Sequence, residues 1–387
     1  MRSFEDDLVE RLREIDASGL RRVLREISPS QSVLVRREDR DLVNFSSNDY
    51  LGLACHPALV EAAQNELACS GSGSGASRLI SGSLPAHRRM EERLADFKRT
   101  PAALTFSSGY AAATGTIPAL VSENDVVILD KLAHACLIDG AKLSGAHLRI
   151  FPHNDLNALE SRLRWARDTH PNARILIVVE SVYSMDGDTA PLTEIVELKN
   201  RHGAWLMVDE AHGVGVLGER GRGLVDATCL GDRVEVQMGT LGKALGSSGA
   251  YICGSATLRD LLINRARSFI FSTAPTPASV AAAEAAIHLL ADTPEGAERL
   301  AKLHRNIQTL HSSGNTAIHP ILVGLEADAL AAASRLEAAG YLVPAVRFPS
   351  VARGQARLRI SLTADHTPQM VDDLISSLRR GDLRNRA

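Results

Sequence analysis

One lysine lies in a setting where its amine could act as a nucleophile. Lys243 stands between glycines in the segment TLGKALGSSG, just after the apolar run 234–238. Ligands bind at the carboxyl ends of strands in α/β sheets. A partly desolvated lysine at such an end can lose its proton and attack a carbonyl, forming a Schiff base. A surface lysine in a flexible loop is the alternative, so other motifs must decide.

An acid and a histidine end a second apolar run, in the segment WLMVDEAHG. If this run is a buried strand, Asp209 lies at its carboxyl end and needs a cationic or hydrogen-bond-donating partner. A pyridinium nitrogen would be such a partner, because pyridoxal phosphate enzymes use an acid in that role. His212 could then reach a polar group of the same cofactor. The alternative is a helix-capping Asp209 with His212 on a loop.

Backbone N–H groups at the start of one expected helix could hold a phosphate. The sequence SSGY at 107–110 lies between an expected strand and an expected helix, and helix N-termini bind phosphate well. The run SGSGSGAS at 70–77 completes neither a P-loop nor a dinucleotide fingerprint, so it is predicted to be a flexible loop. Gly109 and Tyr110 are therefore the better candidates for an anion site.

Three further side chains are candidates, and each has an ordinary alternative. His134 follows the apolar run 126–129 and could stack on a ligand or bond to it, and Ser184 follows the run 175–179 in the same way. Both residues could instead be plain polar loop residues. Arg359 alternates with apolar residues near the C-terminus, and its fork suits a substrate carboxylate, although a surface salt bridge is the usual role of an arginine.

A largely parallel sheet is expected to position these residues. Short apolar runs alternate with helical segments through the middle of the chain, a pattern typical of βαβ units whose strands are buried on both faces. The expected strands of this sheet are 102–106, 126–129, 148–151, 175–179, 204–208 and 234–238, and a separate short strand over 42–45 precedes them. The expected helices include 4–15, one that begins at Pro57, 156–167 and 192–202.

The pattern changes after about residue 285 to that of a smaller α+β domain. Its expected elements are a helix over 297–310, a strand near 318–323, an Ala-rich helix over 328–339, a strand over 357–362 and a last helix that opens at Thr367. We expect three parts: an N-terminal arm of helix and strand (1–55), a large cofactor-binding α/β domain (56–285) and the small C-terminal domain (286–387).

Composition narrows the class of function. The 387 residues include 43 Lys+Arg and 46 Asp+Glu, so a formal net charge of −3 provides no basic field for nucleic acid or anionic membrane. The five cysteines are odd in number and lack CxxC spacing, so neither a zinc site nor a disulfide framework is expected. The charged N-terminus does not resemble a secretory signal, and the apolar runs are too short to span a bilayer. We expect a cytoplasmic protein.

The order of the motifs is more informative than any single motif. They are NDYLG at 48–52, SSGY at 107–110, His134, YSMDG at 183–187, DEAHG at 209–213, TLGK at 240–243 and RLR at 357–359. In this order they resemble the α-oxoamine synthases, pyridoxal phosphate enzymes of the aspartate aminotransferase fold (fold type I). The resemblance runs from about Arg21 to the last helix. It implies a largely parallel central sheet, a smaller C-terminal domain and a homodimer that shares its active site.

The resemblance also implies a role for each matching position. Lys243 would form the Schiff base and move protons at the substrate Cα, while Asp209 would pair with the ring nitrogen and His212 with the ring hydroxyl. The implied cofactor contacts are Gly109, Tyr110, His134 (stacked on the ring), Ser184, Thr240 and, reaching the phosphate of the neighbouring subunit, Thr273. The implied substrate contacts are Arg21 on the acyl side, Asn48, His134, Ser350 and Arg359.

The implied reaction joins an amino acid to an acyl thioester with loss of CO₂. The segments NFSSNDYLGL, ASRLISG and PAHRRMEE favour the branch that uses L-alanine and a pimeloyl thioester, carried on coenzyme A or a carrier protein. Ser350 lies in FPSVA, where the family usually has Pro-Pro-Thr-Val-Pro, so the acyl-chain preference stays open. The alternatives are condensation of glycine with acetyl-CoA or succinyl-CoA, an aminotransferase, and a non-catalytic module that binds coenzyme A or a carrier protein.

Overall fold

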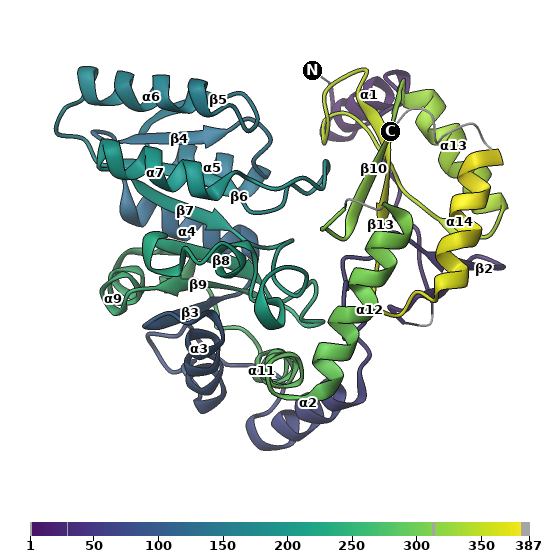
Figure 1. Cartoon of the computed structure of the whole chain (residues 1–387), viewed down its shortest axis with the longest axis horizontal. Helices are drawn as coiled ribbons and strands as arrows, with labels where there is room; N and C mark the ends of the chain where they lie inside the picture. Colours follow the sequence, from purple (N-terminus) through teal and green to yellow (C-terminus); the bar gives the residue numbers. More distant parts are fainter. Residues whose placement is uncertain (1, 29, 312–313, 381–387) are drawn as a thin grey trace.

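Two lobes make up the chain in the computed structural model, which describes residues 2–28, 30–311 and 314–380 (Figure 1). The larger lobe surrounds a seven-stranded sheet, and the smaller lobe holds the C-terminal helices and strands. Within these residues no helix combines the length and the apolar character needed to cross a membrane.

The large sheet has the strand order β3-β9-β8-β7-β6-β4-β5. Its strands are β3 (Ala102–Phe106), β4 (Val126–Asp130), β5 (His147–Phe151), β6 (Ile175–Glu180), β7 (Trp205–Asp209), β8 (Val236–Thr240) and β9 (Ala250–Gly254). Only β9 runs antiparallel to its neighbours. The carboxyl ends of the other six strands therefore meet at one edge of the sheet.

Helices cover both faces of this sheet. One face carries α4 (Gly109–Leu120), α5 (Ala135–Leu143), α9 (Ala256–Arg265) and α10 (Arg267–Ile270), and the other carries α3 (Pro85–Lys98), α6 (Leu156–Thr169), α7 (Leu192–His202) and α11 (Pro277–Asp292). Along β6, Ile175, Ile177 and Val179 pack into one core, and Leu176 and Val178 pack into the other. Burial on both faces explains why such strands read as unbroken apolar runs.

The small lobe contains a three-stranded sheet of β10 (Ile318–Gly324), β13 (Ala356–Ser361) and β12 (Ala345–Val346). Its helices are α12 (Pro294–Leu310), α13 (Glu326–Ala338) and α14 (Pro368–Arg380). A second small sheet joins β1 (Leu34–Arg37) and β2 (Arg40–Asn44) to β11 (Tyr341–Leu342). The N-terminal segment thus crosses the small lobe before it enters α2 (Pro57–Ser70), which packs against α11.

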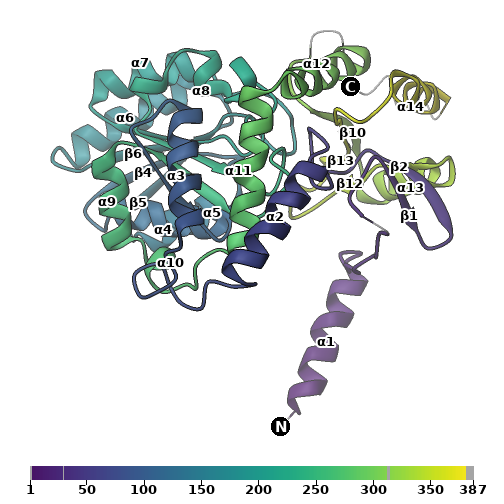
Figure 2. The ribbon, with the colours of Figure 1, turned by 90° about the horizontal axis from the view of Figure 1, so that it is seen from below.

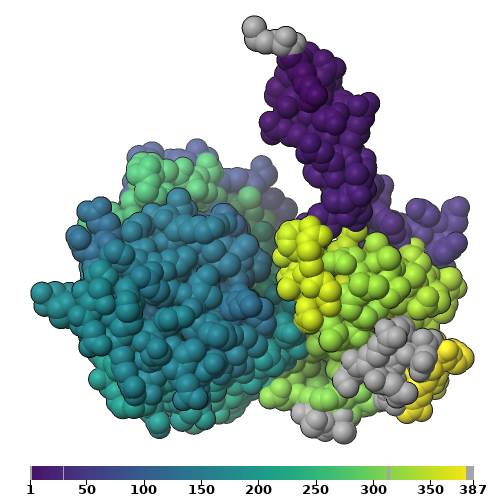
Figure 3. Space-filling model, turned by 90° about the horizontal axis from the view of Figure 1, so that it is seen from above, coloured from purple at the N-terminus to yellow at the C-terminus, as the bar shows by residue number. Residues whose placement is uncertain are grey.

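Helix α1 (Phe4–Ala17) stands away from both lobes (Figures 2 and 3). Ser3 and Asp6 form a capping box at its start, which satisfies two backbone donors. None of its residues is buried, and its apolar side chains Phe4, Leu12 and Ile15 are exposed. Isolated helices of about this length are marginal in water, so a partner surface that covered these side chains would stabilise α1.

The α/β fold with a mainly parallel sheet and a smaller C-terminal α+β lobe is confirmed. The expected strands 175–179 and 204–208 each extend one residue further, so Glu180 and Asp209 belong to the buried sheet. Strand β9 was not expected, nor were the short helices α8 (Leu224–Ala227), η1 (Glu219–Gly221) and η2 (Gly231–Arg233). The division into 1–55, 56–285 and 286–387 remains a prediction, and its second boundary lies inside α11.

Candidate active site

The shared carboxyl edge of the sheet brings the predicted lysine and histidine into contact. Lys243 lies in the loop that follows β8, and His212 lies in the turn that follows β7. The amine Nζ of Lys243 is 2.8 Å from Nε2 of His212. The other ring nitrogen, Nδ1, is 2.6 Å from the hydroxyl of Tyr50. Lys243 is only partly exposed, so the alternative of a surface lysine in a flexible loop does not hold.

Burial lowers the pKa of both contacting groups. Burial lowers the pKa of Lys243 and outweighs the opposing pull of the carboxylates of Asp209 and Glu180. Burial, followed by the charges of Lys243 and Arg359, lowers the pKa of His212 well below its usual value. A neutral lysine amine has a free electron pair and can therefore act as a nucleophile or a base.

Asp209 ends β7 with only 5% of its surface exposed. Its Oδ1 accepts a 2.9 Å hydrogen bond from the backbone N–H of Ala211, so it caps the following turn and is buried at the same time. Burial raises the pKa of its carboxyl. In its ionised form, a buried acid with one backbone donor among the described residues calls for a cationic partner.

Glu180 is a member of the site that sequence reasoning missed. It ends β6 directly opposite Asp209, and it is 3% exposed. Burial, with the negative charge of Asp209, raises the pKa of Glu180 to about 8. Its Oε1 accepts a 2.5 Å hydrogen bond from the backbone N–H of His134. The signal was available in sequence, because the apolar run 175–179 ends in an acid just as the run before Asp209 does.

His134 begins α5, and its ring remains exposed beside Asp209 and Lys243. Its Nδ1 lies 3.0 Å from the sulfur of Cys136 and accepts from that residue's backbone N–H. Burial of part of the ring lowers the pKa of His134. An exposed, neutral ring at this edge provides a flat surface on which a planar ligand could stack.

Arg359 enters the same group from the small lobe, on β13. Its Nε donates to the carbonyl of Ser184 at 2.6 Å, and its Nη1 donates to the hydroxyl of Ser361 at 2.8 Å. Its Nη2 donates to Oδ1 of Asn48 at 3.2 Å. Arg359 is 5% exposed, so it is a buried, hydrogen-bonded cation and does not form a surface salt bridge. A guanidinium has five N–H donors, which leaves capacity for a substrate carboxylate.

The loop 181–190, which carries Ser184, is tied to the large lobe by His153. The Nδ1 of His153 lies 3.0 Å from Asp130 Oδ1, and its Nε2 lies 2.7 Å from Asp188 Oδ2. Burial lowers the pKa of His153, but hydrogen bonds to these two carboxylates outweigh that effect and raise it to about 10. The imidazolium therefore bridges the end of β4 and the loop.

This bridge predicts a pH effect on stability. Because the pKa of folded His153 exceeds its unfolded value of about 6.5, its contribution is complete below that pH and is lost as pH rises through about 10. We expect the free energy of unfolding to fall more between pH 6.5 and 9.5 in the natural chain than in His153→Gln. Urea unfolding at both pH values measures this difference. The exposed His147→Gln should behave as the natural chain, and equal falls in all three would contradict the assignment.

The start of α4 offers backbone donors to an anion. Ser108 caps this helix by accepting from the backbone N–H of Ala111, and no hydrogen bond from the N–H groups of Gly109 or Tyr110 is found within the described residues. The Tyr110 hydroxyl donates to Asp139 at 2.6 Å. Because β3 leads into α4 at the shared edge, these N–H groups fit the predicted phosphate position.

The other predicted residues take three positions. Thr240 accepts from the N–H of Gly242 and so shapes the turn before Lys243. Arg21 and Ser350 are exposed, and no described contact joins them to the Lys243 group; Arg347 holds the carbonyl of Arg21 at 3.0 Å and so brings the N-terminal arm to the loop of Ser350. Thr273 is exposed and pairs with Ser77 at the surface of the large lobe.

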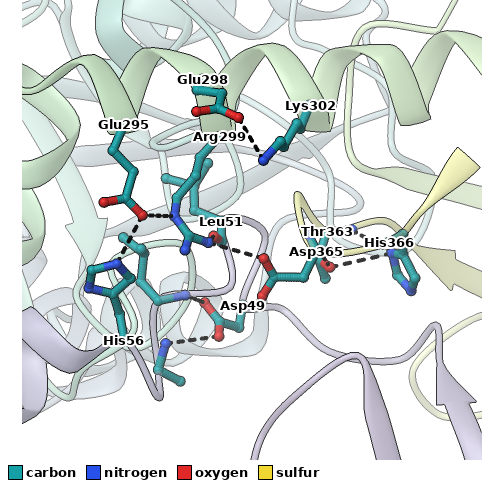
Figure 4. Close-up of polar contacts among 12 residues, drawn as sticks. Asp49, Leu51, His56, Glu295, Glu298, Arg299, Lys302, Thr363, Asp365 and His366 are labelled. Atoms are coloured by element: carbon teal, nitrogen blue, oxygen red, sulfur yellow. Dashed lines mark hydrogen bonds and ion pairs between the residues drawn. The ribbon is translucent and has the colours of Figure 1, made fainter.

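Arg299 fixes the NDYLG segment between the lobes (Figure 4). Its Nη1 donates to the carbonyl of Leu51 and to Asp365, each at 3.0 Å. Its Nε donates to Glu295 at 3.0 Å, and Glu295 also lies 3.0 Å from the ring of His56. These contacts join the start of α12, the small lobe and the segment that carries Asn48.

Removing this clamp should loosen the segment. Arg299→Ala would leave the Leu51 carbonyl and the Asp365 carboxylate without their donor, and we expect a loss of about 1–3 kcal/mol in unfolding free energy. Lys302→Ala, one turn further along α12, removes only an exposed pair with Glu298 and should change stability by less than about 1 kcal/mol. Thermal and urea unfolding compare the two variants. Equal losses would show that Arg299 has no clamping role.

The residues of this edge fit pyridoxal phosphate, which carries an aldehyde, a pyridine nitrogen and a phosphate. A lysine amine with a lowered pKa, a buried acid that forms no ion pair with a described side chain, and N–H groups at a helix start without a described partner are present together. Comparison with known proteins agrees. The sequence model of the family "Aminotransferase class I and II" matches residues 40–378. The chain belongs to this family of pyridoxal phosphate enzymes.

The relatives narrow the class further. The chain is 47% identical to the 8-amino-7-oxononanoate synthase of Geobacter sulfurreducens over 95% of this chain and 96% of that protein. Among solved structures, a serine palmitoyltransferase from S. paucimobilis with bound PLP covers 98% of each chain at 28% identity and a TM-score of 0.91. The 8-amino-7-oxononanoate synthase of Francisella tularensis covers 89% of this chain and 99% of its own at 27% identity, with a TM-score of 0.74. The family predicted from the motifs is confirmed.

Proposed function

We propose that this chain condenses L-alanine with a pimeloyl thioester to 8-amino-7-oxononanoate, CO₂ and a free thiol, a step of biotin biosynthesis. Full-length identity to 8-amino-7-oxononanoate synthases supports the reaction. The observation that carries the proposal is one hydrogen-bonded group that contains both the Lys243 amine and the Arg359 guanidinium. An amino acid needs both, because its amine reacts while its carboxylate must be held.

Lys243 and Asp209 would hold the cofactor from opposite sides. When bound, pyridoxal phosphate supplies a pyridinium ring that accepts the negative charge developing at the substrate Cα. Asp209 would keep the proton on the ring nitrogen, because a buried carboxylate beside that nitrogen favours its protonated form. The N–H groups of Gly109 and Tyr110 would receive the phosphate, and the ring of His134 would cover the pyridine face.

The same residues would handle the protons of the reaction. Lys243, once displaced by the amino group of alanine, would accept the Cα proton, since burial lowers its pKa and so increases the neutral fraction of the amine. His212 lies within hydrogen-bond distance of this amine and would hold it in place.

Arg359 and Asn48 would orient the amino acid through its carboxylate. Their bond to one another and the bond of Arg359 to the Ser184 carbonyl fix the guanidinium before any substrate arrives. A pre-positioned fork lowers the entropy that substrate binding costs. Ser350 and Arg21, whose segments are both hydrogen-bonded to Arg347, would contact the acyl donor.

Replacing Arg359 with lysine should weaken alanine binding. Lysine keeps the charge but loses the planar fork and its bonds to Ser184 and Asn48. We expect KM for alanine to rise at least about tenfold, the effect of losing one charged hydrogen bond. Steady-state kinetics at saturating acyl donor measure this change. The exposed Arg305→Lys should leave KM unchanged, and an unchanged KM in Arg359→Lys would remove Arg359 from carboxylate binding.

The direct test is thiol release across a matrix of substrates. The purified chain with pyridoxal phosphate is mixed with alanine or glycine and with pimeloyl-CoA, a pimeloyl carrier protein, acetyl-CoA or succinyl-CoA. We expect rapid thiol release with alanine and a pimeloyl donor. Faster release with glycine and a short acyl-CoA would instead assign the related glycine-condensing activity, and no release with any pair would favour an aminotransferase.

A cytoplasmic homodimer with a shared active site is part of this proposal. The uncovered apolar stripe of α1 and the exposed position of Thr273 support contact with a second copy. The described cysteines are all free thiols, which suits a reducing compartment.

A further inference from the structure

A continuous row of hydrogen bonds passes through a tyrosine that has no role in the proposed reaction. Tyr50 is completely buried. Its hydroxyl lies 2.6 Å from His212 Nδ1 and 3.2 Å from Asn48 Oδ1. Lys243 lies 2.8 Å beyond the other nitrogen of His212, and Arg359 donates to the far side of Asn48. Tyr50 thus stands midway between the reactive amine and the carboxylate-binding arginine.

The number of protons on Tyr50 and His212 limits which atom can donate in each of these hydrogen bonds. Burial raises the pKa of Tyr50, so its hydroxyl keeps its one proton. Neutral His212 also carries one N–H, on either nitrogen. Oδ1 of Asn48 can only accept, and it already receives a bond from Arg359. Tyr50 can therefore donate to His212 Nδ1, which places the ring N–H on Nε2, or donate to Asn48, which leaves Nε2 bare.

The contact distances favour the first arrangement. The hydroxyl lies 2.6 Å from His212 Nδ1 but 3.2 Å from Asn48 Oδ1, and the shorter contact lies in the usual range for a strong hydroxyl bond. The ring N–H on Nε2 then points at Lys243. An ammonium group cannot accept that bond, whereas a neutral amine can.

We propose that Tyr50 is a positioning residue that sets the tautomer of His212, so that Nε2–H faces Lys243 and holds its amine in the neutral form, which attacks once its lone pair leaves that hydrogen bond. The inference deepens the proposed function and rests on it only for the identity of the substrate. The donor at Nε2 would also suit the phenolic oxygen of pyridoxal phosphate. Other charged or titratable groups around Lys243 and His212 are Asp209, Glu180, Arg359, Cys136 and His134.

Nitrogen NMR of the full chain tests the tautomer without any substitution. The chain is labelled with ¹⁵N-histidine and recorded with and without pyridoxal phosphate, and the His212 signals are assigned by their loss in His212→Asn. We expect the protonated-nitrogen shift at Nε2 and the bare-nitrogen shift at Nδ1. A proton on Nδ1 in the natural chain would overturn the proposal.

Tyr50→Phe tests the consequence for the amine. The probe is pyridoxal phosphate itself, and the readout is the pH dependence of its rate of capture by the cofactor-free full chain, followed by absorbance. Without the hydroxyl, Nε2 is free to accept from an ammonium group, so we expect the neutral fraction of Lys243 at pH 7, and with it the capture rate, to fall about tenfold, the equivalent of one pKa unit. The pH midpoint should rise correspondingly.

Tyr251→Phe is the matched control. Tyr251 is also completely buried, but its hydroxyl has no hydrogen-bond partner within the described residues. We expect this variant to keep the natural pH midpoint, and circular dichroism establishes that both variants fold. A Tyr50→Phe midpoint equal to that of Tyr251→Phe would overturn the proposal. These readouts need no acyl donor, so a chain that releases no thiol would refute the proposed reaction and leave the role of Tyr50 standing.

Discussion

The variant Lys243→Ala is expected to lose both the visible absorbance of lysine-bound pyridoxal phosphate and the release of thiol. The methyl group of alanine cannot join the cofactor aldehyde or accept the Cα proton. General-base catalysis alone contributes about 10²–10⁴-fold to rates, so we expect kcat below about one thousandth of the natural value. Absorbance spectra of the purified protein and a thiol-release assay with alanine and pimeloyl-CoA measure the two losses.

Lys142→Ala is the control for this variant. Lys142 is exposed near the end of α5 on the large lobe, so its removal should leave both the spectrum and the rate unchanged. If Lys243→Ala still turned over at the natural rate, the amine would have no part in the chemistry. The proposed function would then lose its principal residue.

The variant Asp209→Asn is expected to keep part of its cofactor while losing most of its activity. The amide is similar in size to the carboxylate and can still accept from the Ala211 N–H, so the turn after β7 should persist. A neutral amide cannot stabilise a protonated pyridine nitrogen. If the lost pairing is worth about 3 kcal/mol, kcat should fall about 100-fold. Cofactor content and kcat are measured on the same preparation.

An exposed acid provides the comparison for Asp209→Asn. Asp232 is exposed and precedes β8, so it lies near the amino end of that strand, away from the carboxyl edge that carries the site. Asp232→Asn should therefore retain full activity. Rates of Asp209→Asn close to those of the natural chain would show that the ring nitrogen needs no anionic partner. Complete loss of folded protein, detected by circular dichroism, would instead show that Asp209 is chiefly structural.

The large sheet could be predicted from sequence because its strands are buried on both faces. The run at 102–106 coincides with β3, and the helix at 192–202 coincides with α7. The predicted strands end one residue before β6 and β7 do, because a charged residue normally marks the surface. Here the charges of Glu180 and Asp209 face an internal site. Strand β9 has the short sequence AYICG and follows a glycine- and serine-rich loop. Its apolar run is too short for the sequence to predict a strand there.

The site could be predicted only in part, because its partners are distant in sequence. Lys243, Asp209 and His212 follow from local pattern, since each lies at a strand end. The contact between Tyr50 and His212 spans 162 positions, and no local pattern encodes it. The approach of Arg359 to Asn48 spans 311 positions and depends on how the two lobes pack. Sequence order identified these residues as a set, whereas their pairing required the fold.

Borohydride reduction followed by peptide mass spectrometry tests the central claim most directly. Reduction converts the lysine–cofactor bond into a stable secondary amine, so the modified peptide reports which side chain holds pyridoxal phosphate. We predict that the reduced pyridoxyl phosphate group is found on Lys243. Its attachment to a different lysine, or no attachment at all in a yellow, cofactor-loaded preparation, would contradict the account.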